Sequence, residues 1–567
     1  MAGKPNHKAT ETQRISNFSA PSVAPWLKRI FLWLPPLAFL TIAFFWPLAR
    51  ILTLTFNINT LSSENIQLAF RVLGFTFYQA ALSTLLTLAL GLPSAVLFAR
   101  YEFHGKSFLR ALTAVPFMLP TVVVAASFNS LLGQRGLLNN ILHSSAFTVH
   151  PFVAILLAHI FYNTTILIRI VGTALSNLDP KLEQTARSLG ADTFHVWWNV
   201  TLPLLRPAIF AACLLVFLFD FTSFGVILLL GGSRFATLEV EIYNQAARNL
   251  NLALAALLAI IQLVCTLIFS IFYTRLTARL VTPLTPRTAQ NRRAKTLREK
   301  IFVTTFVLVL SVFFLLPLSS LPIRSLFRFE ADRGQRGEVQ YGFTTDYYKE
   351  LFINRRDSVF YVPPIQATVN SLAYASATVI ISLLLGFPAA FALARPTRLE
   401  KILDPLIMLP LGSSAVMLGL GFIISFGRWL TSPWLVPFAH TLIALPFVIR
   451  TLQPAITSIP QRLRQAASSL GASPREVWKS IDLPILRRAT LAAATFAFTI
   501  SLGEFGATLL LARPEYPTIP VAIERFLSQP GGLNYGQAMA MATILMMLTV
   551  ISILIIEKFR LPNAGEF

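Results

Sequence analysis

Long apolar blocks alternate with short charged segments along the chain, and this pattern predicts twelve membrane-spanning helices. A helix needs roughly 18 apolar residues to cross a hydrocarbon core about 30 Å thick. The predicted spans of the first set are 30–48, 75–99, 111–132, 153–174, 207–230 and 252–273. Those of the second set are 301–323, 367–394, 405–426, 437–457, 489–511 and 536–556. The sequence therefore predicts an all-α polytopic membrane protein with two sets of six transmembrane helices.

An internal repeat relates the two sets. Residues 182–206 read LEQTARSLGADTFHVWWNVTLPLLR, and residues 463–487 read LRQAASSLGASPREVWKSIDLPILR, at a constant offset of 281. Upstream, GLPSAVLFAR at 91–100 matches GFPAAFALAR at 386–395 at an offset of 295. Because each copy holds an even number of spans, both copies face the same way and form a parallel 6+6 tandem repeat. A substrate pathway is expected near the pseudo-two-fold axis between them.

The distribution of charge predicts the orientation of the chain. Hydrophobic residues make up 55% of the sequence and charged residues only 13%, which excludes an ordinary soluble enzyme. The net charge of +22 would suit nucleic-acid binding, but the basic residues lie in short segments between spans. If the N-terminus is cytoplasmic, the inside segments carry 30 Lys and Arg and the outside segments 15. The positive-inside rule then predicts cytoplasmic termini, contact with membrane lipid and no nucleic-acid partner.

These patterns predict five segments along the chain. A cytoplasmic tail (1–29) precedes a first six-helix domain (30–273), and a basic cytoplasmic linker (274–300) leads to a second six-helix domain (301–556) and a cytoplasmic C-terminal tail (557–567). The second domain contains a long external loop at 324–365.

The repeated segment at 182–206 predicts a short helix outside the membrane. Leu182, Ala186 and Leu189 recur at helical spacing and form a narrow apolar face, and Gly190 permits a sharp turn after them. The copy at 463–487 repeats each step. One interpretation is a helix that lies on the lipid headgroups. Two copies on the same side of the membrane instead favour a pair of docking elements.

The pattern Q-x-A-x-S-L-G-A, followed by L-P at 202–203 and at 483–484, resembles the EAA loop of bacterial ABC importer permeases. The resemblance covers almost the whole chain, although Gln184 and Gln465 stand where the family usually has an acid. It implies a bacterial inner-membrane protein whose two loops dock on two copies of a separate ATPase subunit. The implied docking residues are Leu182, Gln184, Ala186, Leu189, Gly190, Leu463, Gln465, Ala467, Leu470 and Gly471.

Three further segments indicate a particular group within this permease family. The fused two-copy chain with SFGVILLLGG at 223–232, TLEVEIY at 237–243 and GEFGATLLL at 503–511 is similar to the ferric iron and thiamine permease group. This similarity implies an external substrate-binding protein that delivers the cargo, and it leaves ferric iron and thiamine as alternatives.

The sequence lacks the motifs of an enzyme. It contains no G-x-x-x-x-G-K-[ST] loop, so ATP hydrolysis is expected on another chain, and it contains no H-E-x-x-H or G-x-S-x-G motif. His159 and His440 are single residues near the middle of spans and are interpreted as hydrogen-bonded packing residues, although ionisable groups within spans are also functional candidates. Cys213 and Cys265 are interpreted as inert buried thiols. We expect no cofactor and no metal site.

Two carboxylates within predicted spans are candidates for the pathway. Asp220 and Glu504 lie beside Phe224 and Phe505, and a buried carboxylate is costly unless it faces water or a partner. One hypothesis is that they line the pathway and lower the barrier for a cationic cargo. The alternative is that they pair with polar neighbours between helices.

The mechanism that the resemblance implies is alternating access, in which the ATPase subunits move the two loops and the six-helix halves rock. A secondary transporter driven by an ion gradient remains the competing class, because such proteins also use parallel repeats.

Overall fold

The computed structural model describes residues 25–56, 61–141, 149–278, 292–329, 341–354, 362–394 and 396–559. Most of the two predicted tails, the middle of the predicted linker (279–291) and two parts of the predicted external loop (330–340 and 355–361) lie outside the described residues. The described part is helical apart from one short antiparallel pair, β1 (Phe327–Arg328) and β2 (Gly342–Phe343). The all-α prediction is confirmed.

Most helices of the first half have a counterpart in the second half. The helices of the first half are α1 (Pro25–Leu40), α2 (Trp46–Thr55), α3 (Ser63–Arg100), α4 (Lys106–Met118), α5 (Thr121–Leu132), α6 (Leu137–Ile141), α7 (Pro151–Ser176), α8 (Pro180–Ser188), α9 (Thr193–Val196), α10 (Leu202–Phe221), α11 (Gly225–Gly231), α12 (Leu238–Tyr243) and α13 (Leu252–Ala278). Those of the second half are α14 (Leu297–Leu326), α15 (Asp346–Lys349), α16 (Pro364–Leu393), α17 (Arg398–Met408), α18 (Ala415–Phe426), α19 (Leu435–Thr457), α20 (Gln461–Ser469), α21 (Pro474–Val477), α22 (Leu483–Gly503), α23 (Gly506–Leu511), α24 (Ile519–Leu527) and α25 (Gly532–Phe559).

Ten helical segments in the described ranges are long and apolar enough to cross a membrane. The third predicted span of each half differs, because α4 meets α5 at a bend of 110° and the segment Arg398–Gly412 meets Ala415–Trp429 at 96°. Extended backbone at Leu119 and Ser413 makes these bends. Pro120 follows Leu119 directly, and the 3-10 turn Leu409–Gly412 precedes Ser413. Hydropathy alone runs through both bends, so the predicted straight spans 111–132 and 405–426 are wrong in shape. The count is twelve if each bent pair is one span.

The fifth span of each half lies closer to the N-terminus than predicted. The helical segments run over Thr193–Phe221 and Pro474–Gly503, instead of 207–230 and 489–511. Each begins in the repeated loop and passes through a π-helical stretch, η3 (Trp197–Thr201) or η9 (Trp478–Asp482), without interruption. Each then breaks before the short helix α11 or α23. The apolar run continues across the break, which is why the sequence pattern places the span too late.

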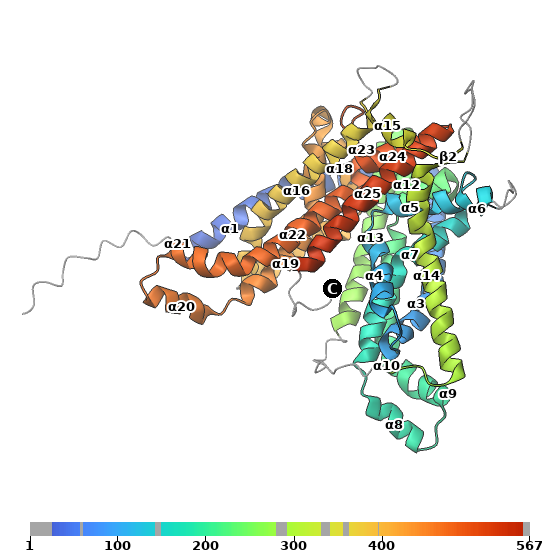
Figure 1. Ribbon diagram of the computed structural model, residues 1–567. Helices are drawn as coiled ribbons and strands as arrows, with labels where there is room; N and C mark the ends of the chain where they lie inside the picture. Colours follow the sequence, from blue (N-terminus) through green and yellow to red (C-terminus); the bar gives the residue numbers. More distant parts are fainter. Residues whose placement is uncertain are drawn as a thin grey trace, which may run out of the picture.

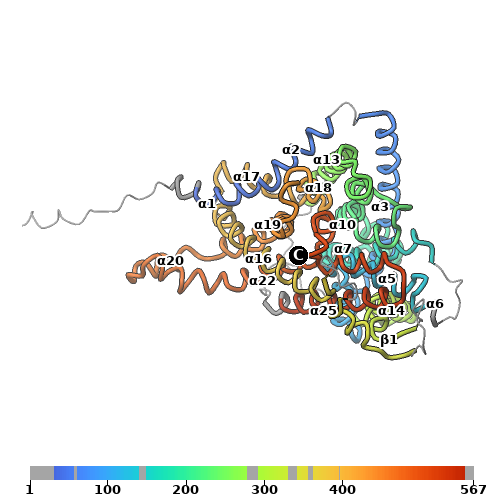
Figure 2. The backbone as a smooth tube through the Cα atoms, turned by 90° about the horizontal axis from the view of Figure 1, so that it is seen from above, coloured from blue at the N-terminus to red at the C-terminus, as the bar shows by residue number. Residues whose placement is uncertain are grey.

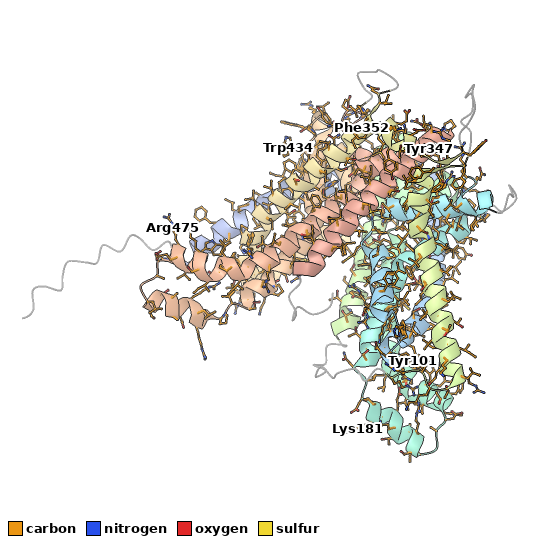
Figure 3. All side chains as sticks on the ribbon, in the orientation of Figure 1. Tyr101, Lys181, Tyr347, Phe352, Trp434 and Arg475 are labelled. Carbon is orange, nitrogen blue, oxygen red and sulfur yellow. The ribbon has the colours of Figure 1, made fainter. Side chains whose placement is uncertain are left out.

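The two halves meet at one end of the molecule and separate at the other (Figure 1). Helices α15, α18, α23 and α24 gather where the halves meet, which we call the joined end. The loop helices α8–α9 and α20–α21 lie at the far tips of the two halves, which we call the splayed end. Figure 3 places Tyr347 and Phe352 at the joined end, and Lys181 and Arg475 at the two tips.

The first helix of each half packs against the other half. Buried Trp33 of α1 belongs to the core of the second half, and its indole Nε1 donates a hydrogen bond to Glu400 Oε1 at 3.3 Å. In the opposite direction, Ser320 of α14 donates to the carbonyl of Ser127 in α5 at 3.0 Å. Figure 2 shows α1 and α2 running beside α17 and α18, and α14 lying near α5. The halves are therefore interlocked.

Candidate transport pathway and coupling loops

Phe224 and Phe505 meet between the two halves. They occupy equivalent positions at the 281-residue offset, each in the break that follows the fifth span. Their ring centroids are 5.4 Å apart at an interplanar angle of 32°, and both side chains are buried. Because equivalent residues can touch only at the axis that relates the repeats, this pair marks the pseudo-two-fold axis. The two tilted rings are thus in contact at the axis.

The glycines after these rings allow the breaks to pack closely. A Cβ atom on Gly225 would lie 2.6 Å from Thr121 Oγ1, at the first residue of α5. A Cβ atom on Gly506 would lie 3.1 Å from the Cβ of Ala415, at the first residue of α18. In each half, the bend of the third span therefore rests against the break of the fifth. Side chains at either glycine would push these two elements apart.

Asp220 is buried at the end of α10, with 1% of its surface exposed. Asn163 Nδ2 donates to its carboxylate Oδ1 at 2.7 Å, and Gln79 Nε2 donates to its backbone carbonyl at 2.7 Å. His159 Nδ1 lies 3.5 Å from the same Oδ1, and its Nε2 lies 2.9 Å from Ser223 Oγ. The Asp220 carboxylate therefore joins α10 to α7, and its backbone carbonyl joins α10 to α3, all within the first half.

Glu504 is also buried, at 7% exposure, and caps α23. Its two carboxylate oxygens accept the backbone N–H groups of Ala507 at 2.8 Å and Thr508 at 2.9 Å. His440 Nε2 lies 3.2 Å from Oε2, and His440 Nδ1 lies 2.7 Å from Ser501 Oγ. A negative charge at a helix N-terminus is favourable, and the adjacent histidine adds a further polar contact.

Each half contains a polar cluster of one histidine and one carboxylate, and the carboxylate occupies a different repeat position in each half. His159 and His440 are equivalent, Asp220 corresponds to Ser501, and Ser223 corresponds to Glu504. Each histidine thus contacts one residue before the break and one within it, and one of the two is a carboxylate in each half. Both carboxylates bind polar neighbours inside their own half, which is the environment that the alternative interpretation of the sequence describes. Both histidines are buried and hydrogen-bonded, as the interpretation of them as packing residues expects.

A second pair of equivalent residues at the axis was missed by the sequence reasoning. Tyr243, at the end of α12, packs edge-on against Phe224 with ring centroids 5.7 Å apart. Its equivalent in α24 is Glu524. Burial raises the pKa of the Tyr243 phenol, and the nearby Glu524 carboxylate raises this pKa further. The 281-residue offset alone would have identified the pair, because it relates TLEVEIY to the less similar TIPVAIE.

The two predicted docking helices are exposed. Neither α8 nor α20 contains a buried residue, and the leucines that end them, Leu189 and Leu470, are 83% and 88% exposed. Gly190 and Gly471 follow with φ angles of +89° and +86°, a left-handed conformation that favours glycine. The remaining predicted docking residues lie on these two helices, and they are Leu182, Gln184, Ala186, Leu463, Gln465 and Ala467.

An ion pair holds each loop helix to a neighbouring element, but the loop helix contributes the acid in the first loop and the base in the second. In the first loop, Glu183 pairs with Arg100 at the end of α3 and accepts a hydrogen bond from Thr201 Oγ1 at 2.7 Å. In the second loop, the equivalent positions hold Arg464 and Asp482, and Arg464 Nε donates to Asp482 Oδ1 at 2.8 Å. The same two positions are thus joined in both loops by different chemistry.

A two-copy helical bundle with a pair of exposed loops at one end is the architecture of an ABC importer permease, a multi-pass component of the inner membrane. The chain belongs to the family of binding-protein-dependent transport system inner membrane components, which it matches over residues 88–282 and 382–559. These segments cover well over half of the sequence, one in each half. The family predicted from the two loops is therefore confirmed.

Named relatives match the chain over most of its length. The thiamine transport system permease protein ThiP of Brucella abortus (strain 2308) is 29% identical over 512 residues, which are 88% of this chain and 89% of that protein. ThiP of Escherichia coli K12 is 27% identical over 503 residues, covering 86% and 88%. A probable ABC transporter permease protein, y4fN of Sinorhizobium fredii, is 24% identical over 578 residues and covers 99% of both chains.

Proposed function

We propose that this chain is the permease of an ATP-driven importer for thiamine. The splayed end lies in the cytoplasm together with both termini, and its two loops each bind one copy of a separate ATPase subunit. A substrate-binding protein docks at the joined end and releases its cargo there. The lack of buried residues in α8 and α20 supports the docking role, because these helices need no rearrangement to meet a partner.

The observation that carries this proposal is the contrast between the two ends of the molecule. Equivalent rings touch at the axis, whereas the equivalent loop helices lie at separate tips (Figure 1). Such a molecule is closed to the outside and open toward the cytoplasm. ATP binding would draw the two loops together, and the interlocked halves would then rock until Phe224 and Phe505 separate.

The residues at the axis suit an aromatic cation such as thiamine. Phe224, Phe505 and Tyr243 supply ring faces, and Glu524 supplies a negative charge near Tyr243. A cation gains energy from contact with aromatic rings, particularly where water is excluded. Thiamine carries a fixed positive charge and two flat rings, so it matches both features. The named thiamine permeases support this cargo, whereas none of the relatives named above supports ferric iron.

Uptake measurements test both the cargo and the energy source. The tagged chain is purified in mild detergent with the proteins that accompany it, and the complex is reconstituted into vesicles with labelled thiamine outside. ATP supplied to the ATPase face should drive uptake, and excess unlabelled thiamine should compete where ferric citrate does not.

A secondary transporter would behave differently. In intact cells, its uptake would collapse when an uncoupler dissipates the ion gradient while ATP is maintained. Uptake that persists under these conditions and stops when ATP is depleted supports the importer. Uptake that follows the ion gradient would overturn the proposal.

A further inference from the structure

The structure contains two grooves at equivalent places, one beside each coupling loop. The first groove, of about 410 Å³, is lined by Leu92 and Val96 of α3 and by Trp197 of η3. The second, of about 390 Å³, is lined by the equivalent Phe387 and Phe391 of α16 and by the equivalent Trp478 of η9. A hollow that recurs between the same two elements of both repeats belongs to the fold and is not an accident of one loop.

Exposed apolar residues lead into both grooves. Leu85 is exposed on α3 two turns before Leu92, and Leu384 is exposed on α16 one turn before Phe387. Leu483 and Leu491 line the second groove on α22 and are exposed as well. In a membrane-spanning bundle, exposed apolar surface is covered by lipid acyl chains. Both grooves therefore continue the lipid-facing surface.

Each groove also carries an arginine that is free to bind an anion. Arg187 of α8 lines the first groove and Arg487 of α22 lines the second. Both side chains are exposed, and neither has an ion-pair partner among the described residues. Arg100 also lines the first groove, but it is engaged by Glu183 and lies over the Trp197 ring at 5.7 Å.

We propose that each groove holds one anionic phospholipid from the leaflet at the splayed end. The acyl chain follows the apolar wall of α3 or α16, and the phosphate binds Arg187 or Arg487. Trp197 and Trp478 lie at the boundary between chain and headgroup, where tryptophan is enriched in membrane proteins. The site does not depend on the identity of the cargo.

The position of the grooves assigns a role to this lipid. One wall is a spanning helix and the other is the π-helical stem of the coupling loop, so a bound lipid bridges two elements that must move together. Figure 3 places Tyr101, which also lines the first groove, just inside the tip that carries Lys181. The lipid therefore supports the stem directly behind the docking helix.

Native mass spectrometry of the full chain tests the proposal. The chain is transferred into detergent containing phosphatidylglycerol or phosphatidylcholine with identical acyl chains, and the lipids retained per chain are counted. We expect two retained phosphatidylglycerol molecules and little phosphatidylcholine. The Arg187→Gln, Arg487→Gln double variant should lose phosphatidylglycerol occupancy by about fivefold at each groove, the effect of one basic residue near an anionic headgroup.

The matched control is the Lys181→Gln, Arg462→Gln double variant, which removes the same charge from the loop helices outside the grooves. It should retain both lipids. Equal retention of the two lipid classes by the native chain, or equal loss in the control and test variants, would overturn the proposal in favour of a diffuse basic surface.

A second measurement locates the lipid. Phosphatidylglycerol with brominated acyl chains should quench the tryptophan fluorescence of the native chain, and it should quench a Trp197→Phe, Trp478→Phe variant distinctly less. Unchanged quenching in this variant would place the lipid elsewhere and would also refute the site.

Discussion

Arg464 and Asp482 form an ion pair at 2.8 Å where the first repeat has Glu183 and Thr201 at the equivalent positions. The first loop instead takes its positive charge from Arg100, at the end of α3. The two loops therefore keep the same tether between docking helix and stem but distribute its charges differently. Two ATPase subunits of identical sequence would meet two surfaces of different charge.

This exchange predicts a rescue experiment in the second loop. Arg464→Glu alone places two acids together and should lower stability by about 1 kcal/mol or less, because the pair is partly exposed. Arg464→Glu combined with Asp482→Thr recreates the residues of the first loop, and Arg395 is the sequence equivalent of Arg100. We expect the double variant to recover the melting temperature and the transport rate of the native protein.

Asp482→Thr alone serves as the control, since it leaves Arg464 without its carboxylate. A double variant that is no better than either single variant would show that the two loops do not share one tether design.

The contact between Phe224 and Phe505 at the axis predicts a leak when one ring is removed. Phe505→Ala opens the contact with Phe224, and loss of a buried phenylalanine side chain costs about 3–5 kcal/mol. We expect labelled thiamine to escape from loaded vesicles that contain the variant without ATP or binding protein. Phe422→Ala is the matched control, because Phe422 is equally buried in α18 of the second half and packs against the ring of Phe426 in its own helix.

The control should lose comparable stability but remain tight to thiamine. Leakage of both variants would indicate a general loosening of the bundle, and the Phe224–Phe505 contact would then not be the barrier.

The repeat offset carries more structural information than the hydropathy profile does. The offset correctly aligns the two loops, and it also relates Phe224 to Phe505 and Tyr243 to Glu524, which meet or lie close together at the axis. Hydropathy finds the spans but misses the bends at Leu119 and Ser413, because an apolar run looks the same whether the helix is straight or broken. It also cannot show that α1 belongs to the core of the opposite half, since that packing depends on tertiary contacts.

The hydrogen-bond partners of Asp220 and Glu504 could not be predicted from the sequence either. Asp220 and Glu504 are not equivalent at the 281-residue offset, and the sequence gives no sign that the equivalent histidines His159 and His440 unite them in one kind of cluster. In the first half, the cluster forms because α3, α7 and α10 come together, and this packing depends on tertiary contacts.

The cluster at Glu504 predicts a specific effect of neutralising its charge. Glu504→Gln keeps the shape of the side chain, but its amide nitrogen cannot accept a backbone N–H, so one of the donors of Ala507 or Thr508 is left without an acceptor. We expect a loss of about 1–3 kcal/mol in stability and slower transport, because the break before α23 is held less firmly. Asp220→Asn should have a smaller effect, since the carbonyl oxygen of asparagine can still accept from Asn163.

Thermal unfolding and thiamine uptake, measured on the same preparations, separate two roles. Unchanged stability with lost uptake in both variants would favour direct electrostatic contact with a cationic cargo, as the pathway hypothesis proposes. Normal uptake at normal expression in both would exclude that hypothesis.

Substitutions in the docking helices α8 and α20 should reduce transport strongly while leaving the fold unchanged. Ala186→Asp together with Ala467→Asp places a charge on the middle of each exposed helix, and no residue of α8 or α20 is buried, so folding and melting temperature should stay unchanged. We expect the ATPase to be lost from the affinity-purified complex and ATP-driven uptake to fall to background. Ala247→Asp, at an exposed position in the π-helical turn Asn244–Arg248 after α12, introduces one such charge away from the loops and is the control. If the ATPase remains bound to the double variant at native levels, the two helices are not the docking elements, and a surface helix on lipid headgroups becomes the better account of the repeated loop.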